Sequence, residues 1–202
     1  MKIVKYIKKS NGNYQIIFDN EKKINIQEDV IIKNNLLYKK EIDNDLLLKI
    51  IVENEEYEIY NKCVNYIGVR LRSINEIREY MARKDISLEK QEEVIERLLK
   101  NKLLDDSVFA RAFIKDKMNF TTMGPYRIEL ELKKHKIDDK IIKKYINEID
   151  RDMIYDKIDK QINKLIKSNK NKSNLRNKIY NNLLGLGYSS EMVVSMINKY
   201  NL

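Results

Sequence analysis

Few residues of this chain are of the types that carry out chemistry. It has one histidine, His135, and one cysteine, Cys63, so histidine-based metal sites and most nucleophilic constellations lack their parts. We expect His135 to lie at the surface or at a helix end. Cys63 lies in an apolar helical pattern, which favours a core position over a reactive thiol. The sequence therefore predicts no catalytic residue, no metal and no cofactor.

The pair Asp105-Asp106 admits two interpretations. Hydrolases use neighbouring carboxylates to hold Mg²⁺, whereas two carboxylates at the start of a helix over Ser107 to Asn119 suit its positive end. No further carboxylates have an obvious matching placement, so helix capping is favoured and a metal-dependent nuclease remains the alternative. Gly185-Leu186-Gly187 resembles the start of a dinucleotide fingerprint, but no predicted strand precedes it, which favours a glycine helix end.

A stripe of lysines is the best candidate for binding a polyanion. Lys157, Lys160, Lys164 and Lys167 are spaced 3, 4 and 3 on one side of a helix predicted over Asp152 to Lys167. The net charge is +9, and residues 151–202 carry ten basic against four acidic groups, so we place any DNA contact toward the C-terminus and extend it to Lys178. A solvated helix face explains the stripe equally well.

Three arginines are weaker candidates for contacts with a protein partner. Arg72 and Arg78 lie around the first predicted inter-helix turn, beside Arg70, and Arg127 follows Gly124-Pro125. Only 9 of the 40 basic residues are arginine, so these positions are harder to attribute to a general bias in composition. Packing within the chain is the competing interpretation.

The N-terminal segment has a different pattern from the rest. Lys2 to Lys8 and Tyr14 to Phe18 are typical of strands joined by a turn at Asn11-Gly12, and Lys22 to Ile26 could add a third strand. From Asp43 the apolar spacing becomes helical. We predict a β-rich cap over about residues 1–45, within an N-terminal domain of residues 1–52.

Beyond residue 53, residue types return every 51 positions. Two series lie on one helix face and one marks helix N-caps: Ile77, Ile128 and Ile179; Met81, Leu132 and Leu183; Ser87, Asp138 and Ser189. The repeat predicts three-helix units at residues 53–104, 105–150 and 151–202. The expected fold is mainly α, with tandem three-helix repeats in an elongated curved array beside the small N-terminal β-rich cap.

Several motifs together resemble the RecX family of recombination regulators. They are Leu71-Arg72-Ser73 with Glu76-Ile77-Arg78, Leu103-Leu104-Asp105-Asp106 with Phe109-Ala110, Gly124 with Arg127-Ile128, and Gly187-Tyr188. The family commonly has glycine near the end of each repeat's second helix, where this chain has Asp85, Lys136 and Gly187. A left-handed backbone at Lys136 would be mildly strained.

The resemblance implies a non-enzymatic regulator, acting in DNA repair, recombination and the SOS response. Such a protein binds the RecA filament and single- or double-stranded DNA, and modulates, chiefly inhibits, RecA. The alternative is a DNA-binding helical repeat protein that acts without RecA. Met1 to Asn20 lacks an apolar core of signal-peptide length, and Leu46 to Val52 is too short to span a membrane. We therefore expect a cytoplasmic monomer without membrane contact.

Overall fold

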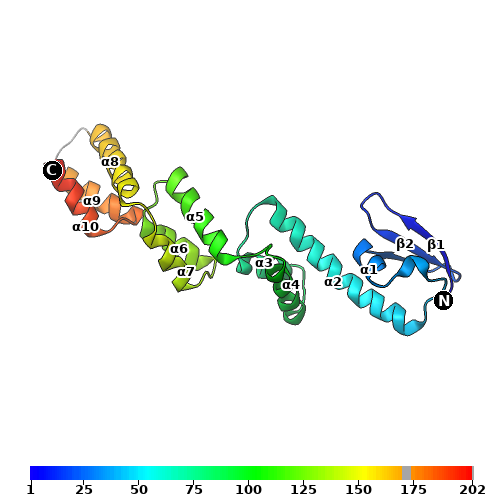
Figure 1. The fold of residues 1–202 in the computed structure, drawn as a ribbon. Helices are drawn as coiled ribbons and strands as arrows, with labels where there is room; N and C mark the ends of the chain where they lie inside the picture. Colours follow the sequence, from blue (N-terminus) through cyan, green and yellow to red (C-terminus); the bar gives the residue numbers. More distant parts are fainter. Residues whose placement is uncertain (170–173, 202) are drawn as a thin grey trace. The chain divides into compact units, whose positions relative to one another are not determined.

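The protein is mainly helical, with a small sheet at its N-terminus (Figure 1). The computed structural model describes residues 1–169 and 174–201. The predicted fold class, a helical protein of three-helix units with a β-rich cap, is confirmed. In the described part of the chain, no helix combines the length and apolar character that a membrane crossing requires.

The N-terminal cap is a three-stranded antiparallel sheet in the order β1-β2-β3. Its strands are β1 (Ile3–Lys8), β2 (Tyr14–Phe18) and β3 (Lys23–Ile26), close to the predicted segments. The turn at Asn11-Gly12 can form because Gly12 adopts the positive φ, +86°, that this turn requires. Helix α1 (Glu28–Lys33) and the short 3-10 helix η1 (Leu36–Tyr38) contribute Val30, Ile31 and Leu36 to the buried core of the cap.

Helix α2 (Asn44–Val69) begins directly after Asp43, where the helical apolar spacing starts, and continues across the boundary predicted between residues 52 and 53. The Asp43 side chain accepts a hydrogen bond from the Leu46 amide at 2.7 Å and caps the helix there. No glycine or proline interrupts the helical pattern until Gly68. Leu47 and Ile50 pack in the core of the cap, whereas Cys63 is fully buried farther along the helix. The predicted core position of Cys63 is confirmed.

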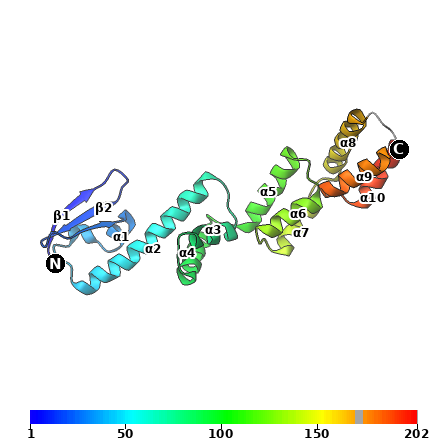
Figure 2. The same cartoon turned by 180° about the vertical axis from the view of Figure 1, so that it is seen from behind.

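The remaining helices form consecutive groups, as the 51-residue repeat predicted. Helix α4 packs against α2, helices α5, α6 and α7 pack against one another, and helices α8, α9 and α10 do the same (Figures 1 and 2). Their bounds are α3 (Ile74–Ala82), α4 (Leu88–Lys100), α5 (Asp106–Phe120), α6 (Pro125–Lys134), α7 (Asp139–Asn147), α8 (Arg151–Ser168), α9 (Leu175–Leu186) and α10 (Ser190–Lys199).

The repeat is visible in both packing and backbone. All six members of the two apolar series are completely buried: Ile77, Met81, Ile128, Leu132, Ile179 and Leu183. Asp85, Lys136 and Gly187, also 51 residues apart, all have left-handed backbones, with φ values of 56°, 55° and 93°. The repeat thus preserves a turn conformation even where glycine is replaced.

The chain divides into two compact units. One comprises residues 1–71 with 80–104, and the other residues 72–79 with 105–202, so α3 contributes to both. The second unit has one continuous core that includes residues of α5 through α10. The four-part division drawn from the sequence and the curvature of the array stay predictions.

Within the second unit, two loops join the last two helical groups through their backbones. The Gly124 amide donates a hydrogen bond to the Leu186 carbonyl at 2.7 Å, and the Tyr126 amide donates to the Gly187 carbonyl at 3.1 Å. The Tyr188 hydroxyl donates to the Thr122 carbonyl at 3.0 Å. Burial raises the pKa of Tyr188 to about 12. This joint connects the start of α6 to the end of α9.

Candidate functional site

A groove of about 650 Å³ lies between the end of α5 and helix α8. One wall is the end of α5 with the segment that follows it, including Asn119, Thr121 and Thr122. The other wall is the exposed side of α8, including Lys160 and Lys164. Both walls belong to the second compact unit. Lys160, Lys164 and Lys167 also line an adjoining hollow. Three of the four predicted lysines therefore lie on one accessible surface.

Lys157 differs from the other three lysines because its ammonium group is engaged inside the protein. Its Nζ donates hydrogen bonds to the carbonyls of Met118 at 2.6 Å and Thr121 at 2.7 Å. These carbonyls lie at the C-terminal end of α5, which attracts a positive charge. Burial lowers the pKa of Lys157 below its ordinary value. In this structure Lys157 positions the wall of the groove.

The charge along α8 changes sign from one end of the groove to the other. Asp150, Asp152 and Asp156 line the end near the helix start, and the lysines line the end beyond it. The Asp150 side chain accepts a hydrogen bond from the Asp152 amide at 3.0 Å and caps α8. Phosphates would be repelled at the acidic end and attracted at the basic end.

The basic region predicted from Lys157 to Lys178 is only partly described. Lys160, Lys164, Lys167 and Lys178 are exposed. Its residues 170–173 lie outside the described residues.

The three candidate arginines fall into two separate places. Arg72 precedes α3 and is half-buried, and Arg78 lies in α3 and is exposed. Arg127 lies in α6, where its Nη1 donates a hydrogen bond to the Gly185 carbonyl at 3.0 Å. Arg127 therefore supports the joint between α6 and α9, in addition to any role in partner binding.

Asp105 and Asp106 cap two different helices. The Asp105 side chain accepts hydrogen bonds from the amides of Ser107 at 2.7 Å and Val108 at 3.2 Å, at the start of α5. The Asp106 side chain accepts a hydrogen bond from the Ile74 amide at 2.8 Å, at the start of α3. Burial raises the pKa of Asp106 above its ordinary value, although the hydrogen bond from the Ile74 amide opposes this shift. This geometry supports the capping interpretation.

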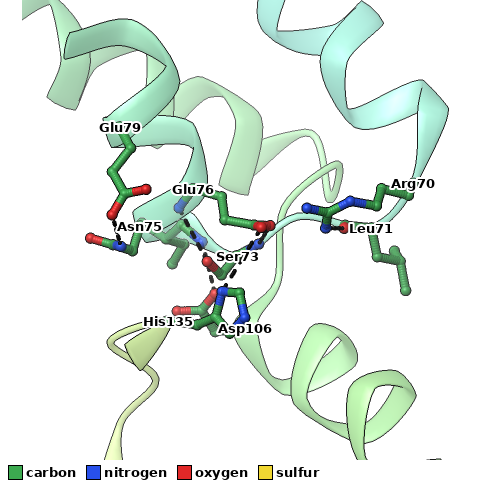
Figure 3. Close-up of polar contacts among 9 residues, drawn as sticks. Arg70, Leu71, Ser73, Asn75, Glu76, Glu79, Asp106 and His135 are labelled. Atoms are coloured by element: carbon green, nitrogen blue, oxygen red, sulfur yellow. Dashed lines mark hydrogen bonds and ion pairs between the residues drawn. The ribbon is translucent and has the colours of Figure 1, made fainter. Parts of the chain in front are cut away.

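The start of α3 also carries a capping box formed by Ser73 and Glu76 (Figure 3). The Glu76 amide donates to Ser73 Oγ at 3.1 Å, and the Ser73 amide donates to Glu76 Oε2 at 3.2 Å. His135 ends helix α6, as expected, with its Nδ1 3.8 Å from Glu76 Oε1. In the described ranges, no three His, Cys, Asp or Glu side chains are grouped so that they could hold a metal ion.

Phe120, the last residue of α5, is not among the candidates predicted from the sequence. It is 82% exposed, although it lies between Asn119 and Thr121, which line the groove. The spacing of the apolar residues in α5 could have identified it. Ile114 and Met118 occupy the buried side of α5, and Phe120 falls two positions after Met118, off that side.

Comparison with known proteins identifies relatives along most of the chain. Family models described as RecX, first three-helix domain, and RecX, second three-helix domain, match residues 60–98 and 105–146. A "Regulatory protein RecX" of Halalkalibacterium halodurans is 34% identical over 139 residues, 67% of this chain and 52% of the relative. One of Bacillus pumilus is 26% identical over 188 residues, 92% of this chain and 72% of the relative. The match thus spans about half of the first relative's length.

Solved structures show the same fold. A crystal structure titled regulatory protein RecX aligns with a TM-score of 0.82 over 98% of both chains, at 21% identity. RecX from Lactobacillus salivarius aligns with a TM-score of 0.69 over 74% of this chain and 98% of that chain, at 26% identity. The arrangement of tandem three-helix domains is therefore shared with these proteins.

Proposed function

Because this chain belongs to the RecX family, we propose that it is a regulatory protein that binds a RecA filament and its DNA and modulates RecA, chiefly by inhibiting its recombinase and ATPase activities. The relatives are named regulatory proteins. Asp105 and Asp106, the pair on which the nuclease alternative was based, both cap helices. We accordingly assign the chain no catalytic step.

The observation that carries the proposal is the exposed lysine row on the groove of α8. Lys160 and Lys164 are one helical turn apart and Lys167 follows, so the three cover roughly 10 Å of the helix. Lysines at this spacing can neutralise neighbouring phosphates and release their counterions. DNA held on α8 would leave other surfaces of the repeats available for RecA.

The proposed contacts with RecA involve Arg72, Arg78 and Arg127. Arg72 and Arg78 lie around the start of α3, and Arg127 lies at the α6–α9 joint. Alanine variants of the first two should weaken inhibition of RecA, and the melting temperature of each variant is measured as a stability control. Arg127→Ala needs the same stability control, because it also removes the hydrogen bond to Gly185. Unaltered inhibition by all three variants would exclude these contacts.

The experiment that tests the function is RecA ATP hydrolysis on single-stranded DNA. The protein is added well below the RecA concentration, with and without excess DNA. Inhibition that persists with excess DNA would indicate direct contact with the filament. No effect, or inhibition fully relieved by DNA, would instead indicate a DNA-binding repeat protein that acts without RecA. Sedimentation of the protein alone tests the expected monomer.

A further inference from the structure

Phe120 combines an exposed ring with a firmly held backbone. Its 82% exposure contrasts with Phe18 and Phe109, which are 1% and 4% exposed. Burying a phenylalanine side chain contributes about 1.5–3 kcal/mol, so leaving this ring in water forgoes a sizeable stabilisation. A single exposed apolar residue is ordinary on a protein surface. Phe120 is of interest because its backbone is held by hydrogen bonds and its sequence neighbours line the basic groove.

The backbone on both sides of Phe120 is tied to the rest of the unit. Lys157 Nζ donates to the carbonyl of Met118, two residues before it, and to that of Thr121, directly after it. Thr121 Oγ1 donates to the Lys117 carbonyl at 2.7 Å, and the Tyr188 hydroxyl donates to the Thr122 carbonyl at 3.0 Å. A ligand that stacks on this ring therefore has to order the side chain but little of the backbone.

Phe120 is also flanked in the sequence by two residues of the basic groove. Its two sequence neighbours line one wall, and Lys160 and Lys164 line the opposite wall on α8. We propose that this groove binds single-stranded nucleic acid, with a base stacked on Phe120 and the adjoining phosphates paired with Lys160 and Lys164. Aromatic platforms beside cationic grooves suit single strands, whose bases are free to stack, whereas duplex bases already stack on each other.

This inference rests on the proposed function, because it uses the same lysines, and it adds the form of the nucleic acid. The acidic end of the groove restricts the path of the strand. Asp152 and Asp156 repel phosphate, so the strand leaves the groove on the lysine side.

The first test is Phe120→Ala, measured by fluorescence anisotropy with a labelled oligothymidine and with a duplex of equal length. The variant should bind the oligothymidine about 5-fold or more weakly, while its duplex affinity changes less than about 2-fold, since phosphate contacts remain. Tyr38→Ala removes another exposed aromatic, 89% exposed and in the N-terminal cap, and should leave both affinities unchanged. Equal affinities for Phe120→Ala and the unaltered protein, or equal losses on both ligands, would overturn the stacking.

A second variant reports the stacking directly. The chain contains no tryptophan, so Phe120→Trp introduces a single fluorescent indole at the proposed platform. Oligothymidine should quench its emission. An abasic oligonucleotide of the same length supplies phosphates without bases and should bind without that quenching. Equal quenching by both ligands would contradict a base on the ring.

The two hypotheses fail differently. If the double variant Lys160→Glu/Lys164→Glu loses binding while Phe120→Ala does not, the groove binds phosphate and the stacking is wrong. If neither variant changes binding, α8 is not the nucleic-acid surface, and both the stacking and the DNA contact of the proposed function are wrong.

Discussion

The backbones of Gly124 and Gly187 lie so close that a Cβ atom added to Gly124 would come within 2.5 Å of the Gly187 carbonyl carbon and oxygen. Gly187 also needs its left-handed backbone, with a φ of +93°, to end α9. The two glycines therefore allow the two loops to approach closely. In this arrangement the Gly124 amide donates a hydrogen bond to the Leu186 carbonyl, and the Tyr126 amide donates one to the Gly187 carbonyl.

Replacing Gly124 with alanine should separate these two loops. Because the added methyl group meets backbone that cannot move aside cheaply, we expect Gly124→Ala to lower the free energy of unfolding by about 1–3 kcal/mol, measured by urea denaturation. Gly185→Ala is the matched control, since a Cβ at Gly185 meets nothing within 4 Å. In α9, that alanine should stabilise by up to about 1 kcal/mol. Equal effects of the two variants would show that the close approach is unimportant.

Lys136 should gain stability on replacement by glycine. It has a φ of 55° at the position where the third repeat has Gly187. Relief of the left-handed strain is partly offset by the greater entropy of the unfolded glycine chain, so Lys136→Gly should raise the free energy of unfolding by about 0.5–1 kcal/mol. Lys143→Gly, in helix α7, should lower it by about 1 kcal/mol. Thermal melts of both variants measure these changes in stability. A loss of stability for Lys136→Gly would contradict the prediction.

Charge reversal on α8 should weaken DNA binding and flatten its salt dependence. For Lys160→Glu/Lys164→Glu, each lost phosphate contact should reduce the slope of log affinity against log salt by about 0.7–0.9. Lys140→Glu/Lys143→Glu makes the same charge change on exposed positions of α7 and serves as the control. Titrations at several salt concentrations measure both slopes. Equal slopes for Lys160→Glu/Lys164→Glu and the unaltered protein would show that α8 does not contact DNA.

Removing the Asp106 carboxylate should destabilise the start of α3. Asp106→Ala leaves the Ile74 amide without its 2.8 Å acceptor and should lower the free energy of unfolding by about 1–2 kcal/mol. Asp106→Asn keeps an oxygen acceptor and should stay close to the unaltered protein. Urea denaturation distinguishes the two.

The same carboxylate pair allows a test of the nuclease alternative. Incubation with single-stranded DNA and Mg²⁺ should leave the DNA intact for the unaltered protein and for Asp105→Asn alike. DNA degradation by the unaltered protein that Asp105→Asn abolishes would restore catalysis as the function.

Cys63 should resist thiol reagents until the protein unfolds. Its side chain is fully buried, and burial raises its pKa from 9.0 to about 11. A disulfide reagent at pH 8 should react slowly with the native protein and rapidly in urea. Because the folded pKa is raised, the contribution of the thiol to stability is complete below pH 9.0 and is lost as the pH rises toward about 11. Cys63→Ala should reduce the loss of stability over that range. Rapid reaction in the native state would contradict this.

Local patterns made much of the fold predictable. The three strands follow alternating patterns around Asn11-Gly12, and the capping box of Ser73 and Glu76 forms as its sequence suggests. The boundary predicted between residues 52 and 53 falls inside the single helix α2. That helix continues because its two ends bury different residues, Leu47 in the cap and Cys63 farther along.

The sequence by itself determined what depends on neighbours along the chain: the helices, their caps, the repeat and the lysine spacing on α8. Only the tertiary structure decided which lysine is used internally, because the carbonyls that Lys157 binds, those of Met118 and Thr121, belong to a different helical group. Likewise, the closeness of Gly124 and Gly187 depends on how two groups pack. Periodicity places residues on a helix face, but packing between helices selects their partners.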